Sequence, residues 1–228
     1  MPEYSFIAHI ENDFTEKFGI PRQSNRIEAL KSRILFEPPY RTPDAFRGLE
    51  DFSHLWVIWE FSEAKREHWS ATVRPPRLGG NIRMGVFATR SPFRPNPIGL
   101  SSVKLDGIEV HPTKGPILHV SGADLMNGTP ILDIKPYLAC SDSHPEASGG
   151  FTENYTQTPL QVIFPQEELE KIPSQSRRAL LAVLAEDPRP GYQKDPDRVY
   201  GIAYADRDIH FQVRGQQLLV LNVSPYQR

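Results

Sequence analysis

Three segments combine side chains that could do chemistry with residues that fix the backbone. The first is the short turn Pro21–Gln23, and the second is Gly85–Leu100, which holds three prolines and two arginines. The third, Ser121–Pro130, carries Asp124 and leads into the further polar residues Asp133, Lys135 and Tyr137. Proline lowers the entropy lost when a site becomes ordered, and arginine offers a planar fork of donors. This combination predicts a rigid, arginine-bearing site for an anionic ligand.

Positive charge is concentrated around the second segment. Between residues 65 and 94 the only acid is Glu67, and the seven bases are Lys65, Arg66, Arg74, Arg77, Arg83, Arg90 and Arg94. The stretch carries a net charge of +6, although the whole chain has a formal net charge of −2. Such a basic stripe favours a specific anionic partner. Solvated arginines on a surface loop are an equally good interpretation of the charge alone.

Structural interpretations stand beside the chemical ones. Asn127-Gly128 is a favoured hairpin turn, so Asp124 could simply brace it. Alternation in Ile131–Lys135 could place Asp133 on a solvated strand face. The seven histidines form no pair at ligand spacing, so we expect no metal site. Cys140, the single cysteine, is expected to be a small buried hydrophobe.

The composition indicates a folded protein with many short elements. Of the 228 residues 39% are hydrophobic and 24% are charged, which excludes extensive disorder. Twenty-two prolines disfavour long helices and central strands, so short strands joined by rigid turns are expected. No apolar run approaches the ~20 residues that span a bilayer, and the N-terminus lacks the features of a signal peptide. We therefore expect a soluble, cytoplasmic protein.

The hydrophobic pattern predicts a mainly β chain. Short strands are expected before residue 140 at Tyr4–Ile10, Leu55–Phe61, Met84–Ala88, Val103–Val110, Ile117–Ser121 and Pro130–Ile134. The apolar run Leu55–Phe61 is interpreted as a buried strand. No strands alternate with long amphipathic helices here, which disfavours a parallel sheet. Glycine and proline clusters between the strands are typical of a barrel or a sandwich.

The character of the chain changes after a polar stretch at 141–158. Helices are expected at Pro165–Ile172 and Ser174–Glu186, followed by strands at Val199–Ala205, Ile209–Val213 and Leu218–Val223. We therefore predict a β-barrel domain over residues 1–141, a linker over 142–158 and a small α+β domain over 159–228.

The motif Gly85–Asn96, taken with Asp133–Tyr137, resembles the TsaA-like (TrmO) family. Further similarity lies in Phe18–Gln23, Gly48–Trp56 and Val73–Asn81. The resemblance implies a single-sheeted β-barrel methyltransferase domain that works as a homodimer and uses S-adenosylmethionine without a metal. It also implies the substrate, which is N6-threonylcarbamoyladenosine at position 37 in the anticodon loop of threonine tRNA.

The resemblance also implies which residues act. The expected cofactor contacts are Pro21, Arg22, Gln23, Phe61, Ser62, Arg90, Leu100, Ser121, Gly122, Ala123 and Asp124. Many relatives have histidine where this chain has Ser62, so a backbone contact is expected there. The N6 proton of the substrate needs an acceptor, and the two candidates are Asp133 and Tyr137.

A non-catalytic RNA-binding β-module is the alternative to the enzyme, and saturable binding of the methyl donor separates the two.

The C-terminal part carries no cofactor motif, but it has a loop with Arg189, Tyr192, Lys194 and Arg198. This composition suits phosphate contact and stacking on nucleobases. The sequence therefore predicts that residues 1–158 bind the donor and that residues 159–228 help to hold tRNA. The alternative is that the C-terminal unit only completes a core or a dimer contact.

Overall fold

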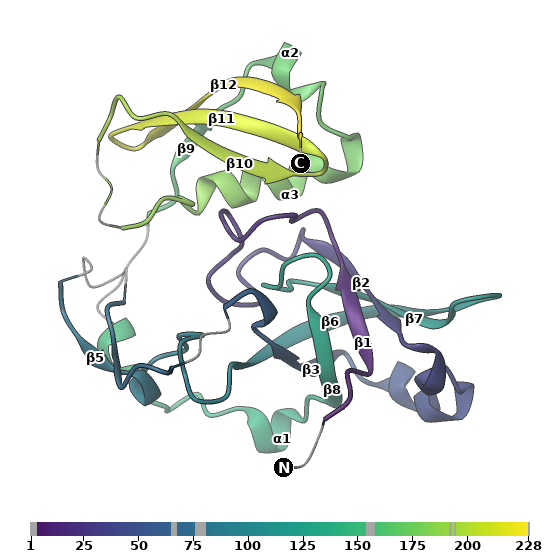
Figure 1. Ribbon diagram of the computed structural model, residues 1–228. Coiled ribbons are helices and arrows are strands. Elements are labelled where there is room, and N and C mark those ends of the chain that lie inside the picture. Colours follow the sequence, from purple (N-terminus) through teal and green to yellow (C-terminus); the bar gives the residue numbers. More distant parts are fainter. Residues whose placement is uncertain are drawn as a thin grey trace.

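A computed structural model describes residues 4–64, 68–75, 81–153, 158–191, 193 and 195–227. The chain forms two β-rich parts, with a barrel below and a smaller C-terminal unit above it in Figure 1. Lys65, Arg66, Arg77, Tyr192 and Lys194, which the sequence singled out, lie outside the described residues.

Within the described residues, six strands close into a barrel in the order β1-β2-β7-β6-β3-β8. All neighbouring pairs are antiparallel. The strands are β1 (Ala8–Glu11), β2 (Lys31–Phe36), β3 (His54–Glu60), β6 (Ile98–His111), β7 (Gly115–Ser121) and β8 (Pro130–Pro136). The expected mainly β fold with a closed barrel is confirmed. Closure removes the unpaired edges that an open sheet would expose.

The barrel wall is buried on its inner face. In β3 the inward side chains Leu55, Val57 and Trp59 are buried, whereas the residues between them are partly exposed. The prediction of a buried strand is therefore correct for one face only. A barrel wall has one inward and one outward face, so successive side chains alternate between them.

Other expectations need correction. The strand expected at Met84–Ala88 is a two-residue strand β5 (Met84–Gly85), paired with β4 (Thr72–Val73) and followed by a 3-10 turn at Val86–Ala88. Cys140 is exposed in the short helix α1 (Ala139–Asp142), so the expectation of a buried thiol is wrong. A four-residue helix on the barrel surface has little apolar surface to bury.

Asn127-Gly128 does not close a hairpin. It lies between β7 and β8, which are not neighbours in the barrel. The amide of Asn127 donates to the carbonyl of Phe14, and that of Gly128 donates to the carbonyl of Ile10, each at 2.8 Å. The turn therefore fastens a crossover connection to the end of β1, and Asp124 is left available for other contacts.

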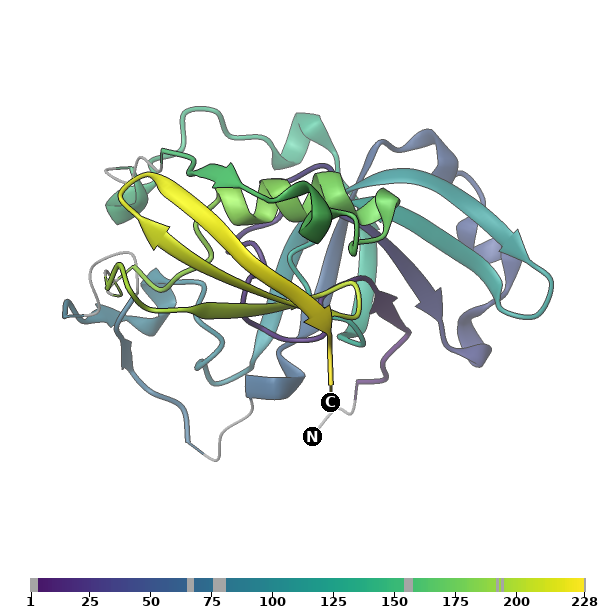
Figure 2. The same cartoon turned by 90° about the horizontal axis from the view of Figure 1, so that it is seen from above.

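The C-terminal unit is a four-stranded sheet with two helices. The sheet has the order β10-β11-β12-β9, and β9 is parallel to β12. Its elements are β9 (Gln161–Ile163), α2 (Gln166–Leu169), α3 (Ser174–Ala185), β10 (Tyr200–Tyr204), β11 (Arg207–Arg214) and β12 (Gln217–Pro225). Helix α3 lies between this sheet and the barrel in Figure 1, and Figure 2 shows it next to β9. The α+β character expected here is confirmed.

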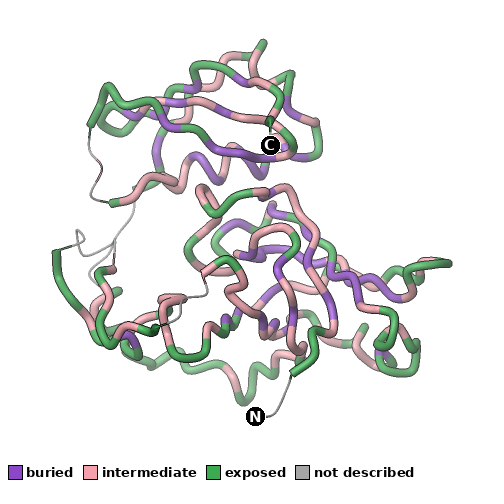
Figure 3. Tube along the Cα trace, viewed as in Figure 1, coloured by how far each residue is buried: buried purple, intermediate pink, exposed green. Residues whose placement is uncertain are grey.

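The buried residues gather into two cores, which appear as two groups of buried chain in Figure 3. The barrel core is built from residues between Ala8 and Ile131. The C-terminal core contains Phe14, Ile27 and Leu30 in addition to residues of the C-terminal unit itself. The segment between β1 and β2 therefore leaves the barrel, enters the second core and returns.

Candidate functional site

A cavity of about 720 Å³ opens where β3 ends and β6 begins. Its walls come from the β1–β2 segment, the end of β3, the proline-rich loop before β6, and the β7–β8 connection. The lining residues include Lys17, Ile20, Pro21, Arg22, Gln23, Trp59, Phe61, Ser62, Thr89, Arg90, Phe93, Arg94, Gly99, Leu100, Ser101, Asp124, Met126 and Thr129.

Eight of the eleven residues predicted to contact a cofactor line this one cavity. They are Pro21, Arg22, Gln23, Phe61, Ser62, Arg90, Leu100 and Asp124. They belong to separate segments of the chain, so their convergence results from folding and not from sequence proximity.

The other three, Ser121, Gly122 and Ala123, are buried in the barrel wall and are not among the described lining residues. The Ser121 hydroxyl donates to the Asp106 carboxylate and lies 2.6 Å from Lys31 Nζ. Gly122 has a φ of +76°, and its carbonyl accepts from the amide of Asn25 at 2.8 Å. These contacts fix the backbone conformation of the segment that leads to Asp124.

Asp124 is one of the acidic residues that line the cavity, together with Glu60 and Glu63. The Ser101 hydroxyl donates to Asp124 Oδ1 at 2.5 Å, and Trp59 Nε1 donates to Ser101 Oγ at 3.0 Å. Burial raises the pKa of the Asp124 carboxyl above its usual value of 3.8, and the Ser101 hydrogen bond and the charge of Arg90 partly oppose that shift. A partly desolvated carboxylate of this kind favours a cationic ligand.

The indole of Trp59 is placed by a glycine. Trp59 pairs with Gly99 across β3 and β6, and a Cβ on Gly99 would lie 2.2 Å from the indole. The ring therefore packs flat on the backbone of β6 and reaches Phe61, whose ring centroid is 4.2 Å away. Together the two rings give the cavity an aromatic wall.

Arg90 and the turn at 21–23 meet across the cavity. Arg90 Nη1 donates to Gln23 Oε1 at 2.5 Å, while Arg22 Nη2 donates to the carbonyl of Arg189 at 2.9 Å. Arg94 folds back on its own loop and donates to the carbonyl of Thr89 at 3.0 Å. The two arginines of the loop thus differ, because Arg90 reaches across the cavity and Arg94 braces the loop.

Asp133 and Tyr137 are not brought into this cavity. The Asp133 carboxylate pairs with Lys135 Nζ at 2.9 Å on the barrel surface, as the solvated-face interpretation expects. The Tyr137 ring packs near Trp56 and His54, and its amide donates to the His54 carbonyl at 2.9 Å. His54 begins β3 and the cavity lies where β3 ends, about 20 Å away at ~3.3 Å per residue.

Ser101, Trp59, Met126 and Thr129 line the cavity although the sequence did not single them out. Ser101 and Trp59 are inward-facing residues that alternate with outward-facing ones in β6 and β3. A polar serine at an inward position of a strand could have indicated a site residue from the sequence. Met126 and Thr129 lie in the crossover, whose path depends on contacts with β1.

Among the described residues, no group of three or more His, Cys, Asp or Glu side chains is placed to hold a metal ion. In the same part of the chain, no helix is long and apolar enough to cross a membrane.

Comparison with known proteins relates both parts of the chain to one family. Residues 9–143 match the family model described as tRNA-methyltransferase O N-terminal domain, and residues 157–226 match the TrmO C-terminal domain. The chain belongs to the tRNA-methyltransferase O family. Membership confirms the family and the enzyme class that the sequence motifs suggested.

Individual members of the tRNA-methyltransferase O family match over nearly the whole chain. The tRNA (adenine(37)-N6)-methyltransferase of Escherichia coli K12 is 39% identical, and the match covers 98% of each chain. A putative S-adenosylmethionine-dependent methyltransferase of Pseudomonas aeruginosa is 38% identical over 96% of each chain. The crystal structure of TrmO from that organism superimposes with a TM-score of 0.79 at 33% identity, covering 99% of this chain and 98% of that one.

Proposed function

We propose that this protein transfers a methyl group from S-adenosylmethionine to N6 of adenosine 37 in tRNA. The observation that carries the proposal is the convergence of eight expected donor-binding residues on one cavity. Its relatives named tRNA (adenine(37)-N6)-methyltransferase support the same reaction.

The cavity suits the donor in size and chemistry. Its volume of about 720 Å³ is in the range of small-molecule sites. The half-buried Asp124 suits a sulfonium cation, the Trp59–Phe61 wall suits an adenine ring, and Arg22 and Arg90 suit a carboxylate. When bound, the donor supplies an electrophilic methyl carbon.

The protein's own residues contribute position and charge. The proline-rich loop fixes Arg90, and the Ser101 hydroxyl holds the Asp124 carboxylate. Methyl transfer is an in-line displacement, so alignment and electrostatic complementarity supply most of the rate enhancement.

The finer substrate we propose is N6-threonylcarbamoyladenosine of threonine tRNA, presented by the anticodon loop to a homodimer. Two exposed arginines at the end of the β4–β5 ribbon support a phosphate-rich partner, because the described stretches 68–75 and 81–94 that hold Arg74 and Arg83 contain no acidic residue. An unstacked loop base is also what a protein can reach in folded RNA.

Calorimetry with S-adenosylmethionine tests the donor site. We expect saturable binding of one donor per subunit that a chelator does not change. Arg90→Ala should weaken donor binding and abolish turnover, because Arg90 joins two walls of the cavity. An absence of donor binding at millimolar concentration would contradict the proposal and favour the non-catalytic RNA-binding module.

Transfer of labelled methyl to purified tRNA tests the substrate. We expect methylation of threonine tRNA that carries threonylcarbamoyladenosine, and none of the same tRNA from cells that cannot make this nucleoside. Equal methylation of both preparations would contradict the finer substrate and leave the N6-methyltransferase proposal intact.

A further inference from the structure

Two exposed aromatic side chains lie side by side next to the cavity. The rings of Trp69 and Phe87 are stacked, with centroids 6.2 Å apart and an interplanar angle of 27°. Trp69 is 52% exposed and Phe87 is 72% exposed. Single exposed apolar side chains are ordinary, whereas contiguous ones are typical of binding surfaces.

The backbone holds this pair firmly. The 3-10 turn at Val86–Ala88 buries Val86 and turns Phe87 outward. The amide of Val86 donates to the carbonyl of Ala71 at 3.0 Å, and the short β4–β5 ribbon continues the pairing. The two rings therefore flank a hydrogen-bonded ribbon, with Trp69 three residues before β4 and Phe87 in the turn that follows β5.

The pair adjoins the wall of the donor cavity. The amide of Ser70, next to Trp69, donates to the carbonyl of Phe93, and Phe93 lines the cavity. Thr89, two residues after Phe87, also lines it. A nucleobase stacked on these rings would thus lie beside the site of methyl transfer.

The charge around the pair identifies the kind of partner. The described residues 68–75 and 81–94 contain Arg74, Arg83, Arg90 and Arg94 and no acid. Arg74 and Arg83 lie immediately beyond the last paired residues of the ribbon, and both are exposed. Aromatic faces interleaved with cations are how proteins hold single-stranded RNA.

We propose that Trp69 and Phe87 form a stacking platform for an unpaired nucleobase of the anticodon loop, with Arg74 and Arg83 contacting the flanking phosphates. This proposal rests on the proposed function and describes how the same site binds its RNA substrate. It binds RNA without contributing to the binding of the methyl donor.

Binding of a synthetic anticodon stem-loop with a fluorescent aminopurine beside adenosine 37 tests the platform. Stacking on an aromatic ring is lost in Trp69→Ala, which should weaken RNA binding about 5- to 100-fold and relieve the quenching of the aminopurine. Trp69→Phe should restore most of the affinity. Donor affinity by calorimetry should stay unchanged in both variants.

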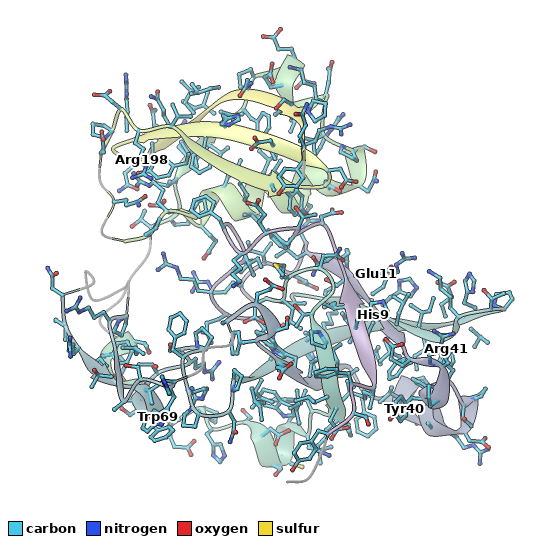
Figure 4. The ribbon with its side chains drawn as sticks, in the orientation of Figure 1. His9, Glu11, Tyr40, Arg41, Trp69 and Arg198 are labelled. Atoms are coloured by element: carbon cyan, nitrogen blue, oxygen red, sulfur yellow. The ribbon has the colours of Figure 1, made fainter. Side chains whose placement is uncertain are left out.

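Tyr40→Ala is the matched control. Tyr40 is 36% exposed and lies on the opposite side of the barrel from Trp69 in Figure 4. This variant should leave RNA affinity unchanged, which separates loss of a stacking contact from loss of any exposed aromatic side chain.

Three results would overturn the platform. The first is an RNA affinity of Trp69→Ala within twofold of the wild type. The second is a parallel loss of donor affinity, which would place the pair in the donor pocket. The third is a change of association state by sedimentation, which would show that the pair joins two copies of this chain. If instead the wild-type protein binds RNA through these rings but transfers no methyl group, the proposed function fails and the platform stands.

Discussion

The barrel and the C-terminal unit differ in where their cores come from. The barrel core is made within residues 8–131, whereas the C-terminal core takes Phe14, Ile27 and Leu30 from the segment between β1 and β2. That same segment carries Pro21–Gln23 into the proposed donor cavity. One unit thus supplies most of the cavity, and the other holds one wall of it in place.

Contacts along the whole segment support this division. The Ala205 amide donates to the Asp13 carbonyl at 3.0 Å, and Arg26 pairs with Glu186 at 2.6 Å. Partly buried Phe18 and Ile20 also pack against the C-terminal core. The C-terminal core therefore takes residues from both sides of the predicted boundary, although most of the residues described between 141 and 153 are exposed, as a linker would be.

The largest effect is expected from removing residues 159–228. Phe14, Ile27 and Leu30 would lose their packing, and burial of each such side chain contributes about 1.5–3 kcal/mol. We expect the truncated chain to aggregate or to lose donor binding by more than tenfold, measured by calorimetry. Adding residues 159–228 as a separate chain should restore part of the affinity.

A soluble truncated protein with normal donor affinity and much weaker tRNA binding would give the opposite answer. It would establish the division of labour expected from the sequence, in which the C-terminal unit only helps to hold tRNA.

The next effect concerns Gly19, where the segment crosses the C-terminal core. Gly19 has a φ of +93°, and an added Cβ would lie 2.1 Å from Ile202 Cδ1. Backbone strain and overpacking together should destabilise Gly19→Ala by about 2–5 kcal/mol and displace the nearby turn at 21–23. Thermal unfolding and donor titration measure the two consequences.

Gly48→Ala is the matched control for that change. Gly48 has a φ of +83° but no atom within 4 Å of an added Cβ, so it incurs only the strain of about 1–2 kcal/mol. It should leave donor affinity unchanged. Equal losses of stability and donor affinity in both variants would show that packing on Ile202 does not position the wall.

A middle-sized effect is expected at Asp124, which the barrel supplies. Loss of a charge-assisted contact in Asp124→Asn should weaken donor binding by about 2 kcal/mol, or roughly 30-fold. Because burial raises the carboxyl pKa, wild-type donor affinity should rise with pH as Asp124 ionises. The variant should lack this rise in a calorimetric pH series.

Stability should respond to pH in the opposite direction. Between the unfolded pKa near 3.8 and the raised folded pKa, the native protein holds a proton that the unfolded chain releases. Wild-type stability therefore falls with increasing pH across this window, and Asp124→Asn removes that contribution. If the stability of Asp124→Asn varied with pH as that of the wild type does, burial of the Asp124 carboxyl would not be the cause of the pH dependence.

The sequence predicted the elements that have a clear apolar pattern. It missed elements whose conformation depends on contacts with residues far away in the chain. Apolar patterns in the sequence located β3, β7 and α3 to within a few residues. Strand β2 was missed because Lys31-Ser32-Arg33 offers few apolar residues, and pairing with β1 and β7 decides its conformation. The same limit applies to the site, because Ser101 meets Asp124 only after the barrel closes.

The smallest effect on donor binding is expected at Asp133 and Tyr137. Both lie outside the cavity, and Tyr137→Phe keeps the ring contacts with Trp56 and His54. Such surface changes usually alter stability by less than about 0.5 kcal/mol, so donor affinity should change less than about twofold.

Single-turnover methyl transfer then isolates the chemical step. If Tyr137→Phe or Asp133→Asn abolished that step at unchanged donor affinity, the proton-accepting role suggested by the family resemblance would hold. For Tyr137, a second copy of the chain would then have to bring the side chain to the cavity, since about 20 Å of strand separates it from the cavity here.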